Sequence, residues 1–344
     1  MRFSANVVAG FGSVSKLGDT LRELGFTKNV LLICGQKSYE VAGRMVEKSL
    51  KKEDYNLRVL SEGIYPSVRR VHELLEKEAA GFPNASVIAV GGGRTVDVAK
   101  YMAKALGTRL AVVPTLLSSD AIASGFSVLW NGTKSRAIET VVPSLVIGDY
   151  DILKNQPRRY VSSGVGDMLS KFSALSDWRL SFWLAGEPYS DFAMNIAKSM
   201  TELLCKRIAD VGAMNYIGIE TLFLAEVTDG YLMELSGTTR VAGGSEHLFA
   251  MAMERLSNDG LHGEYCALGT IIMVYLQRGE SEDVKRLLRL AGTPTTALEL
   301  GIERGKIVKA LTIAHKMRDW YTVLGTKGLS EGAAERIVRY TGVA

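Results

Sequence analysis

The sequence predicts an α/β fold in its first half and an all-helical fold in its second half. Two observations carry this prediction: short apolar runs alternate with helical patterns from Val30 to about Asp149, and only helical patterns follow. Strands that alternate with helices are typical of a parallel sheet with helices packed on it. Pro157 stands where the pattern changes, so we expect two domains, residues 1–156 and residues 157–344.

Composition and charge describe a globular protein and exclude several classes. The 344 residues carry 41 Lys and Arg against 37 Asp and Glu, a net charge of +4, and 47% are hydrophobic. This near-even balance gives no support for nucleic-acid binding. No apolar stretch approaches the ~18 residues of a membrane span, and the first residues do not resemble a signal peptide. Three cysteines are too few for a disulfide framework, so we expect a reducing, cytoplasmic location.

Four apolar runs in the first half have the length and β-branched content of buried strands. They are residues 30–34, 57–60, 87–90 and 110–113. The amphipathic stretches that predict helices between them are residues 71–80 and 96–106. Asn131-Gly132 separates residues 126–130 from a second run that reaches about Val142, and an Asn-Gly pair between two such runs predicts a β-hairpin.

Long helical patterns fill the second half, where strand signals are weak. The expected helices are residues 167–184, 192–214, 217–235, 246–256, 264–278 and 282–291.

The clearest local motif is a glycine triplet directly after the run 87–90. It reads GGGRTVDVAK and comprises Gly91, Gly92, Gly93, Arg94, Thr95, Val96, Asp97 and three further residues. Glycines allow a sharp turn and a close approach of the backbone to a ligand, and the helix that follows directs its N–H groups and positive end toward a phosphate. The motif matches neither GxGxxG nor a P-loop, so a plain strand-to-helix turn stays the alternative.

Metal-type residues are few and far apart. Among four histidines, His247 follows Ser245, a natural N-cap, and His262 follows a turn, so each stands near the start of a predicted helix. Asp167 follows two glycines, where we also expect a helix to begin. Two histidines and one aspartate would leave an open position on a cation such as zinc. Spacing alone favours the alternative, which is two ordinary half-buried histidines and a helix-capping aspartate.

A polar stretch follows the run 110–113. It contains Thr115, Ser118, Ser119, Asp120 and Ser124. Hydroxyls and a carboxylate at the carboxyl end of a parallel strand stand where such sheets bind ligands. The alternative is a solvent loop with local turns.

Five segments in the same order and spacing resemble the sn-glycerol-1-phosphate dehydrogenase family. They are GGGRTVDVAK, VPTLLSSDAIAS, VIGDYDIL with PRRYVSSGVGDMLSKFSALSDWRL, GGSEHLF and LHGEYCALGTIIM. The resemblance extends from about Gly91 to Leu276. The family belongs to a superfamily with iron-type alcohol dehydrogenases, glycerol dehydrogenase and dehydroquinate synthase. The resemblance implies reduction of dihydroxyacetone phosphate to sn-glycerol 1-phosphate for archaeal membrane lipids, by a homo-oligomer with a nucleotide-binding domain followed by a helical metal- and substrate-binding domain.

The resemblance also implies the site residues. The metal ligands are Asp167, His247 and His262, holding one Zn²⁺ per subunit, with nickel or iron as alternatives. The NADPH or NADH contacts are Gly91 to Asp97, Thr115, Leu116, Leu117, Ser118 and Ser124. The catalytic residues are Asp120 and Asp167, and the substrate contacts are Asp120, Asp167 and Met251. Glu246 and Glu264 are candidates for holding the metal-binding histidines, or plain helix N-terminal acids.

Two departures from the family pattern concern the substrate. The loop that commonly reads Ser-His-Asp-Gly has Ser119 and Ala121 on either side of Asp120, and Met251 replaces a histidine one turn after His247. A thioether lacks the ring N–H donor. A dehydrogenase of an unphosphorylated polyol such as glycerol therefore stays an alternative, followed by a dehydroquinate-synthase-like lyase and a non-catalytic nucleotide-binding protein.

The end of the first predicted strand indicates the cofactor preference. An acidic residue there favours the free 2′-hydroxyl of NAD, but none occurs between Cys34 and Tyr39. Lys37 and Ser38 instead suit a 2′-phosphate, so we expect NADPH to be accepted at least as well as NADH. The alternative is that Lys37 points into water.

Overall fold

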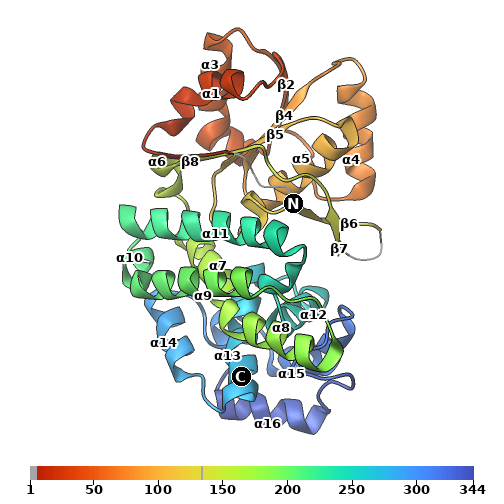
Figure 1. Cartoon of the computed structure of the whole chain (residues 1–344), viewed down its shortest axis with the longest axis vertical. Helices are drawn as coiled ribbons and strands as arrows, with labels where there is room; N and C mark the ends of the chain where they lie inside the picture. The colour runs from red at the N-terminus through yellow and green to blue at the C-terminus, as the bar shows by residue number, and fades with distance from the viewer. Residues whose placement is uncertain (1–5, 133–134) are drawn as a thin grey trace. The chain divides into compact units, whose positions relative to one another are not determined.

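The computed structural model describes residues 6–132 and 135–344. The chain divides into two compact units, Met1–Gln156 and Pro157–Ala344. Figure 1 shows the first unit in red to yellow, with strands and helices, and the second in green to blue, with helices. No helix in the described part of the chain is both long and apolar enough to cross a bilayer.

The first unit is built on a six-stranded parallel sheet, as the alternating pattern predicted. Its strand order is β1-β8-β5-β4-β2-β3. The strands are β1 (Asn6–Gly10), β2 (Asn29–Cys34), β3 (Asn56–Leu60), β4 (Ser86–Gly91), β5 (Leu110–Pro114) and β8 (Leu145–Asp149). β4 lies between β2 and β5, and its last residue, Gly91, pairs with Pro114. The carboxyl ends of three neighbouring strands therefore flank the glycine triplet.

β2, β3, β4 and β5 match the predicted strands, but β1 and β8 were not predicted. β8 is a five-residue run that is buried throughout, and β1 is a partly exposed edge strand. Pairing of β8 with β5 and of β1 with β8 makes both runs strands.

Helices and a hairpin complete this unit. The helices are α1 (Leu17–Glu23), α2 (Gln36–Ser38), α3 (Arg44–Lys52), α4 (Val68–Leu74), α5 (Gly93–Leu106) and α6 (Tyr150–Leu153). β6 (Phe126–Trp130) and β7 (Ser135–Glu139) form the predicted antiparallel hairpin, and residues 133–134 of its connection lie outside the described residues. The core joins the sheet to α1 and α3 through side chains such as Leu21, Val46 and Ile88, while α5 packs on β4, β5 and β2.

The second unit is helical, as predicted. Its helices are α7 (Arg158–Leu169), α8 (Lys171–Ala185), α9 (Asp191–Lys206), α10 (Ile208–Gly212), α11 (Tyr216–Ser236), α12 (Ser245–Leu256), α13 (His262–Arg278), α14 (Glu282–Leu290), α15 (Arg304–Ile313) and α16 (Glu331–Thr341). Two boundaries were predicted wrongly. The pattern 167–184 is divided between α7 and α8, and 192–214 between α9 and α10, because apolar spacing continues across both breaks while the backbone turns.

Candidate metal centre and cofactor loop

Three helices of the second unit bring the predicted metal ligands together. Asp167 lies in the last turn of α7, His247 in the first turn of α12, and His262 is the first residue of α13. The prediction that Asp167 opens a helix is wrong, because α7 already begins after Pro157. The predicted N-cap is displaced by one residue, since Gly244 caps α12 and Ser245 is its first helical residue.

Glycines explain why the ligands converge. α13 packs against both α7 and α12. A Cβ at Gly166 would overlap the carbonyl oxygen of Gly263, and one at Gly263 would overlap the carbonyl oxygen of Ser163. A Cβ at Gly269 would stand 2.9 Å from the carbonyl oxygen of Glu246. Only glycine permits two helix backbones to approach so closely. Asp167, which follows Gly166, and His262, which precedes Gly263, are therefore held side by side.

The ligand atoms face one another over short distances. His247 Nε2 lies 3.3 Å and His262 Nε2 lies 4.0 Å from the same oxygen, Asp167 Oδ1. One atom each from Asp167, His247, His262 and Cys266 forms a group in which all atoms lie within 4.8 Å of one another. Cys266 was not predicted; its only signal in the sequence is its place one turn after His262.

A carboxylate lies at the second ring nitrogen of each histidine. His247 Nδ1 is 3.0 Å from Glu246 Oε1, and His262 Nδ1 is 2.7 Å from Glu254 Oε1. Such partners fix the ring and leave Nε2 to bind a metal. Glu246 therefore holds a histidine ring, as we predicted. Glu254, eight residues before His262, has the same role for His262 and was not predicted. Glu264 lies elsewhere: its carboxylate accepts bonds from Arg159 and from the N–H of Leu261.

The charges of the group suit a cation. Burial alone would raise the pKa of Asp167, but the hydrogen bond with His247 and the charge of Lys171 lower it below its ordinary value. Burial alone would lower the pKa of His247 and His262. Cys266 beside both rings, with Asp167 and Glu246 at His247 and Glu254 at His262, nevertheless raises both pKa values well above the usual range. Donor type, spacing and charge thus all fit a divalent metal ion, and nitrogen, carboxylate and sulfur donors together are those that zinc takes.

The glycine triplet forms the predicted turn between β4 and α5. Gly91 ends β4 with φ +159°, and Gly92 is the N-cap of α5. A Cβ at Gly92 would stand 2.9 Å from Leu116 Cδ1, and one at Gly93 would stand 3.3 Å from the Ala121 side chain. The glycines therefore also let the loop after β5 pack tightly on this turn. The turn places the N-terminus of a 14-residue helix at the carboxyl edge of the sheet, which suits a phosphate.

The loop after β5 is tied to its surroundings by hydrogen bonds. Thr115 N donates to the carbonyl of Gly91, and Leu117 N donates to Gln156 Oε1. The buried Lys100 Nζ donates to Ser124 Oγ at 3.2 Å and lies 4.0 Å from Asp97 Oδ1. Ser124 thus has a structural partner within its own unit, and Lys100 is a further polar residue near the predicted cofactor loop.

The remaining predicted residues lie as follows. Ser118 and Asp120 are half-buried in the loop after β5, with Asp120 in a short 3₁₀ turn. Lys37 is exposed in α2, directly after the carboxyl end of β2. Met251 is half-buried on α12, one turn after His247. Nothing in these positions conflicts with the predicted contacts.

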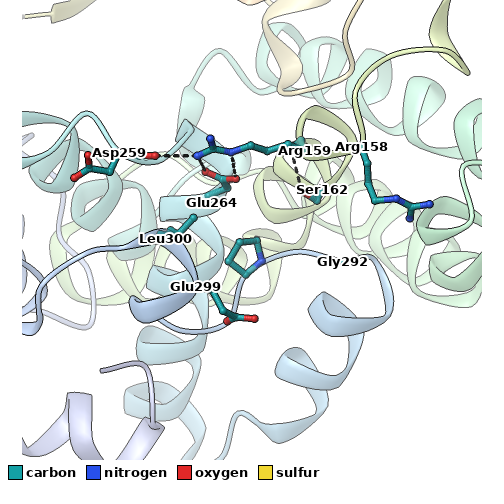
Figure 2. A pocket seen from close by; sticks show the side chains of 9 residues that line it. Arg158, Arg159, Ser162, Asp259, Glu264, Gly292, Glu299 and Leu300 are labelled. Carbon is teal, nitrogen blue, oxygen red and sulfur yellow. Dashed lines mark hydrogen bonds and ion pairs between the residues drawn. The ribbon is translucent and has the colours of Figure 1, made fainter.

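A surface pocket of about 470 Å³ lies elsewhere in the second unit (Figure 2). Arg159 donates to both oxygens of Glu264 and to the carbonyl of Asp259, and Arg158 donates to the carbonyl of Gly212. Glu299 accepts bonds from Thr295 and Thr296 N–H groups. The charged groups of this pocket are bonded within the protein, and none of the predicted metal ligands lines it.

Known structures share this fold. Glycerol dehydrogenase from Schizosaccharomyces pombe superposes with a TM-score of 0.81 at 22% identity, covering 98% of this chain and 89% of that one. A probable glycerol dehydrogenase from Sinorhizobium meliloti gives 0.78 at 21% identity, with 98% and 96% covered. At these identities the likeness concerns the fold.

Sequence relatives are more informative. Residues 8–157 match the iron-containing alcohol dehydrogenase family model. Glycerol-1-phosphate dehydrogenase [NAD(P)+] from Hyperthermus butylicus is 38% identical over 98% of this chain and 97% of its own length. The enzyme of the same name from Pyrococcus furiosus is 36% identical, with 100% and 99% covered. The chain therefore belongs to the glycerol-1-phosphate dehydrogenase family.

Proposed function

We propose that this chain reduces dihydroxyacetone phosphate to sn-glycerol 1-phosphate with NADPH or NADH and a divalent metal ion. Full-length similarity to enzymes named glycerol-1-phosphate dehydrogenase [NAD(P)+] supports the reaction. The observation that carries the proposal is the convergence of Asp167, His247 and His262. A non-catalytic nucleotide-binding protein would not need this group of three metal-type donors, which occupy the positions that the family resemblance implies.

The metal centre is proposed at these three residues, with zinc as the ion. Bound there, the cation supplies Lewis-acid polarisation of the ketone oxygen. Glu246 and Glu254 hold the imidazoles with Nε2 toward Asp167. His262 is the most accessible of the three, with 34% of its side chain exposed, which leaves the substrate a route to the centre.

The cofactor site is proposed on the first unit. The reduced nicotinamide supplies the hydride. The turn Gly91 to Gly93 and the start of α5 bind the pyrophosphate through backbone N–H groups and the helix dipole. Asp120 is proposed to accept a hydrogen bond from a substrate hydroxyl. The cytoplasmic location and the homo-oligomer expected from the sequence stay predictions.

The test is a substrate panel. We expect kcat/KM for dihydroxyacetone phosphate to exceed that for dihydroxyacetone on the order of 10³-fold, because a site that satisfies a phosphate leaves buried donors unpaired when the phosphate is missing. A chelator should abolish the activity and added Zn²⁺ should restore it. His247→Ala should remain inactive with Zn²⁺ while keeping its helical circular dichroism.

The competing assignments give different results in the same panel. Equal efficiency with both ketones would assign the chain to the dehydrogenases of unphosphorylated polyols, which the Met251 departure left open. Turnover of a dehydroquinate synthase substrate without net oxidation of the nicotinamide would assign it to the lyases.

A further inference from the structure

Cys266 faces the metal centre. It lies one turn after His262 on α13 and is fully buried. Its Sγ is 3.5 Å from His262 Nε2, the same nitrogen that lies 4.0 Å from Asp167 Oδ1. The sulfur therefore lies beside Nε2, the nitrogen available to a metal, while the Glu254 carboxylate lies at Nδ1.

Two of three donor separations at the metal centre have the spacing of a tetrahedral site. Zinc binds nitrogen and oxygen at about 2.0–2.2 Å and sulfur at about 2.3 Å, so neighbouring donors in a tetrahedron lie roughly 3.3–3.6 Å apart. The separations here are 3.3 Å between His247 and Asp167, 3.5 Å between Cys266 and His262, and 4.0 Å between His262 and Asp167. The first two separations match this spacing, the third is longer, and all four donor atoms lie within 4.8 Å of one another. Binding of one ion by all four donors therefore requires the side chains to move closer together.

We propose that Cys266 is the fourth protein ligand of the metal ion, as a thiolate. The inference rests on the metal centre of the proposed function and adds a donor to it. Binding replaces the S–H bond with a sulfur–metal bond and releases the proton to solvent. The resting site then has one carboxylate, two imidazoles and one thiolate.

A thiolate ligand changes which metal ions the site prefers. Soft sulfur donors favour zinc and disfavour magnesium or manganese, which prefer oxygen. With four protein donors, a bound zinc ion would accept the substrate oxygen as a fifth donor, an expansion that zinc tolerates. Cys266 thereby favours zinc and limits water at the resting centre.

The competing explanation treats Cys266 as a small apolar side chain that fills space beside the histidines. Co²⁺ alone distinguishes the two, since a thiolate bound to Co²⁺ gives an intense charge-transfer band in the near ultraviolet, separate from the visible d–d bands. We expect the wild-type protein with one equivalent of Co²⁺ to show both. Cys266→Ala and the isosteric Cys266→Ser should keep the d–d bands, lose the charge-transfer band and bind Co²⁺ at least tenfold more weakly.

Matched controls are the other two cysteines, Cys34 on β2 and Cys205 on α9. Cys34→Ala and Cys205→Ala should keep the band. X-ray absorption of the zinc-loaded wild type should show one sulfur neighbour at about 2.3 Å, which Cys266→Ser lacks.

Two outcomes overturn the inference alone: bound Co²⁺ without a charge-transfer band in the wild type, or a band that survives in Cys266→Ala. Failure of wild type to bind Co²⁺ would overturn both this ligand and the proposed metal centre. Inactivity toward dihydroxyacetone phosphate with the band present would contradict the proposed reaction and leave Cys266 as a ligand.

Discussion

The ring orientation of each metal-facing histidine is set by one carboxylate. Glu246 does this for His247 from the adjacent position, and Glu254 does it for His262 from the far end of α12. Removal of such a partner typically weakens metal binding 10–100-fold. The structure thus adds Glu254 to the residues around the proposed metal centre.

The expected cofactor preference depends on a single side chain, that of Lys37. It is exposed directly after β2, where an adenosine ribose lies in nucleotide-binding sheets. We predict that Lys37→Ala weakens NADPH binding by roughly 1–2 kcal/mol and leaves NADH binding unchanged, because only NADPH carries the 2′-phosphate. Fluorescence titration with both cofactors measures this.

Lys48→Ala is the matched control, since it removes the same charge from an exposed position on α3. Equal losses of NADPH affinity in the two variants would mean that the effect comes from the overall positive charge of the protein. An unchanged ratio of NADPH to NADH affinity in Lys37→Ala would place Lys37 outside the cofactor site.

Asp97 makes stability depend on pH. Burial raises its pKa to about 7, and Lys100 offsets this only in part. Between about pH 4 and pH 7 the folded protein keeps a proton here that the unfolded chain has lost, so folding is favoured at the acidic end. We predict that the unfolding free energy of wild type, relative to Asp97→Asn, falls as pH rises through this window, by at most about 1.4 kcal/mol per pH unit, and is constant above it.

Urea denaturation of both proteins at pH 5, 6, 7 and 8 gives this difference directly, and groups common to both cancel. A difference that is flat from pH 5 to 8, or that grows with pH, would contradict the raised pKa.

Among the secondary-structure elements, the crossing of α7 and α13 sets the positions of the proposed metal ligands Asp167 and His262. Gly166 and Gly263 permit it, and each precedes or follows a predicted metal ligand. We predict that Gly166→Ala destabilises the protein by about 1–3 kcal/mol through overpacking and weakens Zn²⁺ binding, because the helices must separate. Gly305→Ala on α15, where a Cβ meets nothing within 4 Å, should be neutral or slightly stabilising.

Chemical denaturation and Zn²⁺ titration of both variants test this. Normal zinc affinity in a folded Gly166→Ala protein would show that the helix spacing does not control the metal centre.

At the scale of the whole molecule, all proposed metal ligands belong to the unit Pro157–Ala344. Metal that binds only the folded state stabilises it by about 2.7 kcal/mol at 100 times the Kd. For a unit of this size we predict a rise in Tm of roughly 5–11 °C on adding Zn²⁺ to chelated protein, by calorimetry. His247→Ala should show no rise, and an equal rise in that variant would mean that zinc stabilises the protein elsewhere.

Fold prediction succeeded where local pattern and packing agree. β2, β3, β4 and β5 are buried strands that lie close to their predicted bounds. It failed where the deciding contact is remote. β8 becomes a strand through pairing with β5, and the break between α7 and α8 interrupts an apolar pattern that continues through it.

The sequence by itself determined the parallel sheet, the helical second half, the glycine turn and, through five segments in order, the family with its Asp and two His. These are properties of local periodicity and of residue identity along the chain. Only the tertiary structure decided that Asp167 ends a helix instead of opening one, that Glu254 holds His262, and that Cys266 faces the same point as the histidines. The physical reason is that glycine contacts between helices remote in sequence set these distances, and no spacing along one chain encodes which helices will touch.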